Sequence, residues 1–286
     1  MKKLLLGSVA TGALIAAGSA NAADLAVKAP RVAPVAPPVP VFSWTGCFVG
    51  AHVGWGWGRH DVTESFTCVS EHTHTTSAAG ATNLDSSGAI FGGQVGCDYQ
   101  FGGFGKGVGG YGGPGSWVIG VQFAGSAADI NGKSPDPFDP SDQSDTLAVK
   151  TDWLGSVTGR LGFTAFSPTM LWYVRGGWAF AHERWDIQHT DLFFGAPSER
   201  QINRNGWTVG VGWEWAFTPN WTAFVEWDHY QFNTKNIASV SFSSGASSVV
   251  TNRLDAKERI ETVKIGVNYR FNFLFGKGKA PVVAKY

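Results

Sequence analysis

The sequence predicts an all-β protein, namely a transmembrane antiparallel up-and-down β-barrel of eight strands that is exported behind a cleaved signal peptide. Three observations support this: an export leader, apolar residues at every second position, and aromatic residues near the segment ends. The 286 residues include 38 Gly and 13 Trp but only 15% charged residues, which is unusual for a soluble domain. The formal net charge of zero gives no electrostatic case for a nucleic-acid partner.

Residues 1–22 have the features of a secretory signal peptide. Two lysines precede an apolar stretch, and Ala20 and Ala22 supply the small residues that signal peptidase accepts. A retained N-terminal anchor is the alternative interpretation. The next segment, 23–42, is rich in Pro and Ala, and we expect an extended periplasmic segment there.

An exported, aromatic-rich chain without membrane helices is either a soluble β protein or an outer-membrane β-barrel, and alternation of residue type separates the two. Within 44–57, 117–125 and 207–217, apolar side chains alternate with small or polar ones. A strand that crosses lipid has this pattern, whereas a helix would not place apolar residues at every second position. No segment after the leader approaches the roughly 20 apolar residues of a membrane helix.

The predicted barrel spans residues 43–273, and residues 274–286 are predicted to form a C-terminal extension. The eight predicted strands are 44–58, 88–101, 116–128, 148–163, 170–183, 205–217, 221–232 and 259–273. The long polar segments, predicted to be extracellular loops, are 59–87, 129–147, 184–204 and 233–258. Short turns alternate with these loops, as in outer-membrane barrels. The glycine-rich stretch 102–115 is longer than the other turns and is interpreted as a flexible linker, with a glycine-rich plug strand as the alternative.

Charged residues on the inward-facing positions indicate how the interior is filled. An eight-stranded barrel has an interior just wide enough for side chains, and charges inside it require partners. We therefore predict a structural charge network that closes the lumen, although the same residues could separately line a narrow wet channel. Its predicted members are Arg160, Arg175, Glu214, Glu226 and Lys264.

Aromatic residues on the outward-facing positions form two predicted bands, as expected where strands meet the two membrane interfaces. The predicted periplasmic band comprises Trp44, Tyr99, Phe101, Trp117, Phe163, Trp172, Phe217, Trp221, Tyr269 and Phe271. The predicted outer band comprises Trp55, Trp57, Trp178, Phe180, Trp207 and Trp227.

Catalysis finds little support in the sequence, and we predict neither an enzyme nor a bound cofactor. The nearest acid–histidine pair, Asp228 and His229, lies within one strand, where adjacent side chains point to opposite faces. In the first long loop, His72 and His74 could bind haem or a metal ion, but two ligands without a third make a weak site. A solvated loop is the simpler interpretation.

The three cysteines leave the disulfide state open. Cys47 and Cys97 are predicted on the outward faces of adjacent strands, so a bond between them is geometrically plausible in an oxidising compartment. Unpaired cysteines are the alternative. Cys68 would remain free or find another partner.

Three motifs in this order resemble a known family: Trp44-Thr45-Gly46 at the barrel start, Arg160-Leu161-Gly162 in the middle, and the closing stretch 266–271. The chain resembles the small porin-like outer-membrane proteins, often called outer-membrane immunogenic proteins, within the OmpA-like barrel class. The resemblance implies surface-exposed loops, association with outer-membrane lipid, and insertion by the barrel assembly machinery. The chain differs from many such barrels because residues 274–286 follow the aromatic residues of its last predicted strand.

We therefore expect a structural and surface-interaction protein of the cell outer membrane, with loops that could meet host or environmental ligands. Envelope integrity is the role that the resemblance implies most directly. The alternatives are a narrow porin for small solutes and a haem- or ligand-binding surface receptor.

Overall fold

The computed structural model describes residues 42–70, 73–103, 115–135, 146–188, 198–243 and 248–271. All of them belong to one compact unit, Val41–Tyr286. The predicted signal peptide with Ala20 and Ala22, nearly all of the Pro- and Ala-rich segment, and the predicted C-terminal extension lie outside the described residues. No helix in the described part of the chain is long and apolar enough to cross a membrane.

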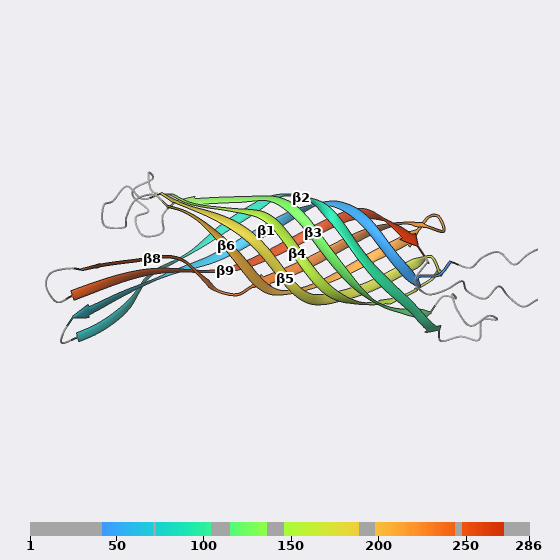
Figure 1. Cartoon of the computed structure of the whole chain (residues 1–286), viewed down its shortest axis with the longest axis horizontal. Helices are drawn as coiled ribbons and strands as arrows, with labels where there is room; N and C mark the ends of the chain where they lie inside the picture. The colour runs from blue at the N-terminus through green and yellow to red at the C-terminus, as the bar shows by residue number, and fades with distance from the viewer. Residues whose placement is uncertain are drawn as a thin grey trace, which may run out of the picture. The chain divides into compact units, whose positions relative to one another are not determined.

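The described residues form nine antiparallel strands (Figure 1). Their bounds are β1 Gly46–Ser70, β2 Thr73–Gly103, β3 Ser116–Pro135, β4 Thr146–Phe163, β5 Met170–Gln188, β6 Ser198–Ala216, β7 Trp221–Phe232, β8 Lys235–Ser243 and β9 Ser248–Phe271. Neighbouring strands pair in the order β1-β2-β3-β4-β5-β6-β7-β9, and β1 pairs with β9 to close the ring. The predicted eight-stranded barrel is confirmed, and β8 is an additional strand paired with β9.

An apolar outward face covers only part of each strand. On β1 it runs from Val49, which is 51% exposed, to Trp57. A membrane-crossing β-strand needs roughly 9–11 residues, whereas β1 has 25. Beyond Trp57 the outward positions carry exposed ion pairs, including Arg59 with Asp85 at 3.0 Å. The strands therefore continue well past the apolar band.

The predicted long loops 59–87 and 233–258 are consequently wrong for most of their length. The β1–β2 pairing continues from Gly46 opposite Asp98 to Ser70 opposite Thr73, with one register shift. The residues 235–243 and 248–258 belong to β8 and β9. Where side chains are described, at 59–63, 83–87 and 253–258, more exposed residues alternate with buried ones, so the two-residue period of a strand continues.

Beyond the apolar band the ring opens into two sheets. The β2–β3 pairing ends at Ser87 opposite Asn131, and the β6–β7 pairing ends at Gly206 opposite Phe232. Past these points, β8, β9, β1 and β2 form one sheet, and β3, β4, β5 and β6 form the other. Figure 1 shows the two groups of strands diverging at the end where β8 is labelled.

We call this region the outer sandwich, because apolar side chains from both sheets pack between them. The buried cluster comprises Val62, Leu84, Leu147, Val149, Trp185, Ile202, Ile237, Leu254 and Ala256. A second apolar cluster lies next along the strands. It comprises Ile90, Ala128, Ile130, Leu154, Ala179, Ala181, Tyr230, Phe232 and Ile260.

Trp44 does not join the outward periplasmic band, and that part of the prediction is wrong. Its side chain is 0% exposed and packs with Val118, Leu171 and Tyr173. The indole Nε1 donates a hydrogen bond to the carbonyl oxygen of Pro168 at 2.9 Å. Strand alternation does not apply to Trp44, since β1 begins at Gly46, whose φ of 144° favours glycine.

Candidate functional site

Charged side chains from strands on different sides of the ring meet inside the barrel in two groups. In the first, which we call the lower network, Arg160 of β4 contacts Glu214 of β6 through Nη2 and Oε2 at 2.5 Å. Arg270 of β9 contacts Glu214 at 3.3 Å and Asp98 of β2 at 2.7 Å. The two guanidinium groups also lie over aromatic rings, with Arg160 4.1 Å from the Tyr173 ring centroid.

The second group, the upper network, lies on β5, β7 and β9. Arg175 contacts Glu226 at 3.1 Å and Asp228 at 2.7 Å. Lys264 contacts the same two carboxylates at 2.8 Å and 2.6 Å. The Tyr173 hydroxyl donates to Glu226 at 3.0 Å, which places this side chain between the two networks.

The structure thus brings together all five side chains predicted for the interior, and it adds three that sequence reasoning missed: Asp98, Asp228 and Arg270. Each network holds two cations and two carboxylates, so each is charge-balanced. Asp228 and Arg270 share the inward parity of Glu226 and Lys264 on their strands, and Asp98 is an inward residue of β2. The requirement for charge balance was the signal that could have identified all three.

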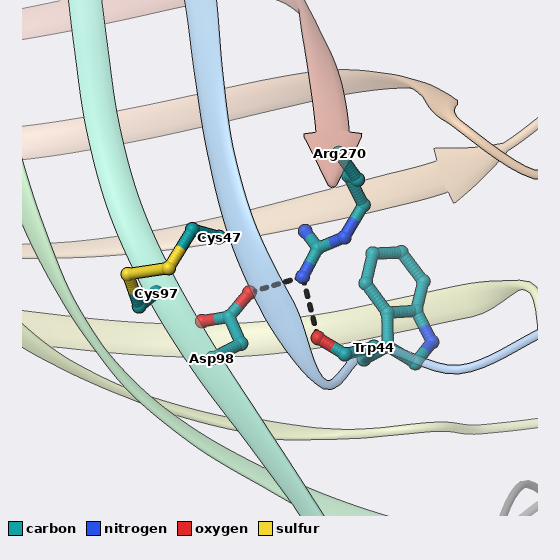
Figure 2. The surroundings of a disulfide bond; sticks show 5 residues. All are labelled: Trp44, Cys47, Cys97, Asp98 and Arg270. Carbon is teal, nitrogen blue, oxygen red and sulfur yellow. Dashed lines mark hydrogen bonds and ion pairs between the residues drawn. A yellow bond between two sulfur atoms is a disulfide. The ribbon is translucent and has the colours of Figure 1, made fainter. Parts of the chain in front are cut away.

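The bond between Cys47 and Cys97 is present (Figure 2). The two residues lie directly opposite each other in the β1–β2 register. Cys68 belongs to β1, but its side chain is not among those described. The disulfide lies beside the lower network, because Asp98 follows Cys97 in the chain and accepts a hydrogen bond from Arg270 (Figure 2).

A third polar group, which we call the outer cluster, lies at the base of the outer sandwich. It comprises His60 of β1, Glu183 of β5, Arg204 of β6 and Glu258 of β9, all at most 1% exposed. Arg204 Nε donates to Glu183 Oε2 at 2.7 Å, and Trp185 Nε1 donates to the same oxygen at 2.8 Å. Arg204 Nη1 also donates to the carbonyl oxygen of Ala256 at 2.8 Å.

Burial controls protonation in the outer cluster. Removal from water, with the Arg204 charge adding to the effect, lowers the pKa of His60 to about 3, so the imidazole is neutral at physiological pH. Burial also raises the pKa of Glu183, although Arg204 opposes that shift. Sequence reasoning missed this cluster because it assigned His60, Glu183 and Glu258 to loop residues or loop boundaries.

Two other sequence-based predictions concern histidines. His72 lies outside the described residues, and the side chain of His74 is likewise not described, so the weak haem or metal candidate stays a prediction. Asp228 points inward to the upper network, whereas the His229 ring contacts Glu261 at 2.5 Å and lies 5.4 Å from the Trp207 ring. The two adjacent side chains therefore occupy opposite faces, as the strand geometry predicted.

The closed ring and its apolar outward band define the class: this is a transmembrane β-barrel protein of the outer membrane. More narrowly, the chain belongs to the outer membrane protein beta-barrel domain family, whose model matches residues 65–271. The expected family and the outer-membrane location are confirmed.

Two relatives from Brucella agree with this assignment. The chain is 30% identical to the 31 kDa outer-membrane immunogenic protein of Brucella melitensis, over 95% of this chain and 100% of the relative. It is 26% identical to the 25 kDa outer-membrane immunogenic protein of Brucella canis, over 95% of this chain and 99% of the relative. Among solved structures, the outer membrane protein OprG of Pseudomonas aeruginosa matches with 12% identity and a TM-score of 0.41, covering 81% of this chain and 99% of that one.

Proposed function

We propose that this protein is a non-conducting, non-catalytic barrel that contributes to the envelope and presents its outer sandwich as an interaction surface. The observation that carries the proposal is the pair of balanced ion networks, which join strands from opposite sides of the ring. In the lower network, Glu214 of β6 is linked to Arg160 of β4 and Arg270 of β9. A conducting pore would need hydrated charges along its path, whereas these charges neutralise one another.

Polar contacts between the networks support the same proposal. Gln122 of β3 donates to Gln94 of β2 at 2.9 Å, and Gln94 donates to Asn268 of β9 at 2.8 Å. Asn268 in turn donates to Glu214 at 3.0 Å. This chain of side-chain hydrogen bonds links residues of four strands and replaces contacts that water would make in an open channel.

The outward surface supports the envelope part of the proposal. Among the residues that the structure describes, twenty-nine large hydrophobic side chains are exposed, most of them on the outward band, where lipid chains would cover them. Beyond the band, exposed ion pairs such as Arg259 with Asp61 at 2.8 Å belong to the part that would face the aqueous exterior.

Conductance in planar bilayers tests the proposal. Refolded wild-type protein should give no steady openings, because no hydrated path is expected through the networks. A variant that removes one balanced pair, R160M/E214Q, should open transiently if it still inserts, while R59A/D85A, which removes an exposed pair, should remain silent. Large, steady openings of the wild type would overturn the proposal and favour a narrow porin instead.

A further inference from the structure

The outer cluster differs from the two networks below it in its charge balance. Two carboxylates, Glu183 and Glu258, meet one guanidinium, that of Arg204, beside the imidazole of His60. All four side chains are buried between the two apolar clusters: along β9, Ala256 lies on one side of Glu258 and Ile260 on the other. An unbalanced carboxylate in such a place is costly unless a further cation or a proton compensates it.

The unsatisfied atoms identify which groups lack a partner. Within the described residues, neither oxygen of Glu258 accepts a hydrogen bond, and Oε1 of Glu183 accepts none. Arg204 Nε lies 3.5 Å from Glu258 Oε2. The other oxygen of Glu183 is held by Arg204 and Trp185, so this carboxylate is oriented while its free oxygen remains available.

His60 completes a convergent set of donor atoms. Its Nε2 lies 3.7 Å from Glu258 Oε1, which is too long for a hydrogen bond. One ligand atom from each of His60, Glu183 and Glu258 lies within 4.8 Å of the others. Two ligands of a tetrahedral ion, with bonds of about 2.0–2.2 Å, are roughly 3.4 Å apart, so small side-chain shifts would complete the site.

We propose that His60, Glu183 and Glu258 bind a divalent transition-metal ion, for which Zn²⁺ is the best fit, and that this ion fastens the two sheets of the outer sandwich together. His60 and Glu258 lie opposite each other on β1 and β9, while Glu183 reaches them from β5 of the facing sheet. The ion therefore joins β5 to β1 and β9, neither of which pairs with β5 within the described residues.

The donor set argues for a transition metal rather than calcium or magnesium. One imidazole nitrogen with two carboxylates suits Zn²⁺ and its neighbours, whereas Ca²⁺ and Mg²⁺ prefer oxygen ligands alone. Arg204 and Trp185 hold Glu183 as partners of a ligating carboxylate commonly do. Ser86 Oγ lies 3.2 Å from His60 Nε2, so the Ser86 side chain must turn away if that nitrogen binds the ion.

Metal analysis of the refolded full-length chain tests the proposal. The protein is refolded in detergent with ZnCl₂, dialysed and measured for bound zinc by mass spectrometry. Wild-type protein should retain one zinc per chain, resist exchange by Ca²⁺ and Mg²⁺, and lose protease resistance of the outer sandwich when a chelator removes the ion. The variants E258Q and H60Q should bind zinc at least about tenfold more weakly.

Two control variants keep the result specific. E261Q changes an outward carboxylate on the same strand and should retain the ion. H72A/H74A removes the histidines predicted as a weak surface site and should also retain it. If E258Q and H60Q fail to fold, the wild-type stoichiometry and the absorption spectrum of bound Co²⁺ decide instead. Absence of stoichiometric zinc in the wild type, or zinc that is lost in H72A/H74A, would overturn the proposal and leave a carboxyl proton as the compensating charge.

Discussion

Arg270 and Trp44 are joined across 226 positions of sequence by a 2.6 Å hydrogen bond from Nη2 to the main-chain oxygen of Trp44. The same nitrogen contacts Asp98 at 2.7 Å, as Figure 2 shows. The guanidinium also lies 4.9 Å from the centroid of the Trp44 ring. One side chain of the last strand therefore fixes the residue that precedes the first strand and balances a carboxylate of the second.

Replacing this guanidinium should be strongly destabilising. R270M removes one cation from a balanced buried network and leaves Asp98 and Glu214 undercompensated. Loss of one partner of a buried ion pair costs roughly 3–5 kcal/mol. The free energy of unfolding, measured by urea titration of the protein in detergent, should fall by that amount. The exposed Arg59–Asp85 pair provides the control, because R59A should change the free energy of unfolding by less than about 1 kcal/mol. Equal effects of R270M and R59A would contradict the prediction.

Reduction of the disulfide should weaken the barrel without opening its ring. Cys47 and Cys97 are separated by 50 positions, and constraining such a loop in the unfolded chain is worth roughly 4 kcal/mol in the chain-entropy model. C47S/C97S should therefore have a lower urea midpoint than the oxidised wild type and match the wild type measured in a reducing agent. Because β1 is paired with β2 along the whole of β1, the folded form should still migrate as a compact band on unheated gels.

Two glycines on paired strands should respond oppositely to alanine. A Cβ at Gly92 of β2 would lie 2.0 Å from the carbonyl oxygen of Gly125, so the β2–β3 backbones would have to separate. A Cβ at Gly125 of β3 would meet no atom within 4 Å. We expect G92A to lose about 1–3 kcal/mol or more, and G125A to stay within about 0.5 kcal/mol or to gain slightly.

The measurement is the folded fraction after refolding, together with the urea midpoint of each variant. The two alanine variants add the same methyl group and differ in the side of the sheet it occupies. If G125A proved as harmful as G92A, close backbone approach would not be the reason that β2 carries glycine at position 92.

The sequence predicted the membrane part of the fold well because a strand that crosses lipid alternates apolar outward residues with small or polar inward ones. The turns between β4 and β5 and between β6 and β7 lie where short polar connections such as Thr218-Pro219-Asn220 interrupt the alternation. Five inward charges were also assigned to the interior from parity alone. Their partners Asp98, Asp228 and Arg270 obey the same parity, so their omission reflects incomplete use of a signal that was present.

The outer sandwich could not be predicted in the same way. Beyond Trp57 the outward positions of β1 turn polar, so the apolar face that indicates a lipid-crossing strand disappears. What remains is a half-buried strand whose inward residues, such as Val62 and Leu84, pack against a sheet distant in sequence. The outer cluster depends on that packing, because His60 and Glu183 meet only when the two sheets face each other.

The outer sandwich should unfold locally when a buried side chain of its apolar core is truncated. Ile237 of β8 is 0% exposed within that core, and β8 is paired with β9 at the edge of its sheet. Truncation of a buried isoleucine to alanine costs about 2–5 kcal/mol, and an edge strand has little else to hold it. I237A should therefore accelerate amide hydrogen exchange in residues 235–243 while exchange in β7, Trp221–Phe232, stays unchanged. K235A, at an exposed position of the same strand, should leave both rates as in the wild type.

If I237A accelerated exchange in β7 as much as in β8, the outer sandwich and the membrane barrel would form one cooperative unit. A metal ion that fastened the sandwich would then stabilise the whole barrel.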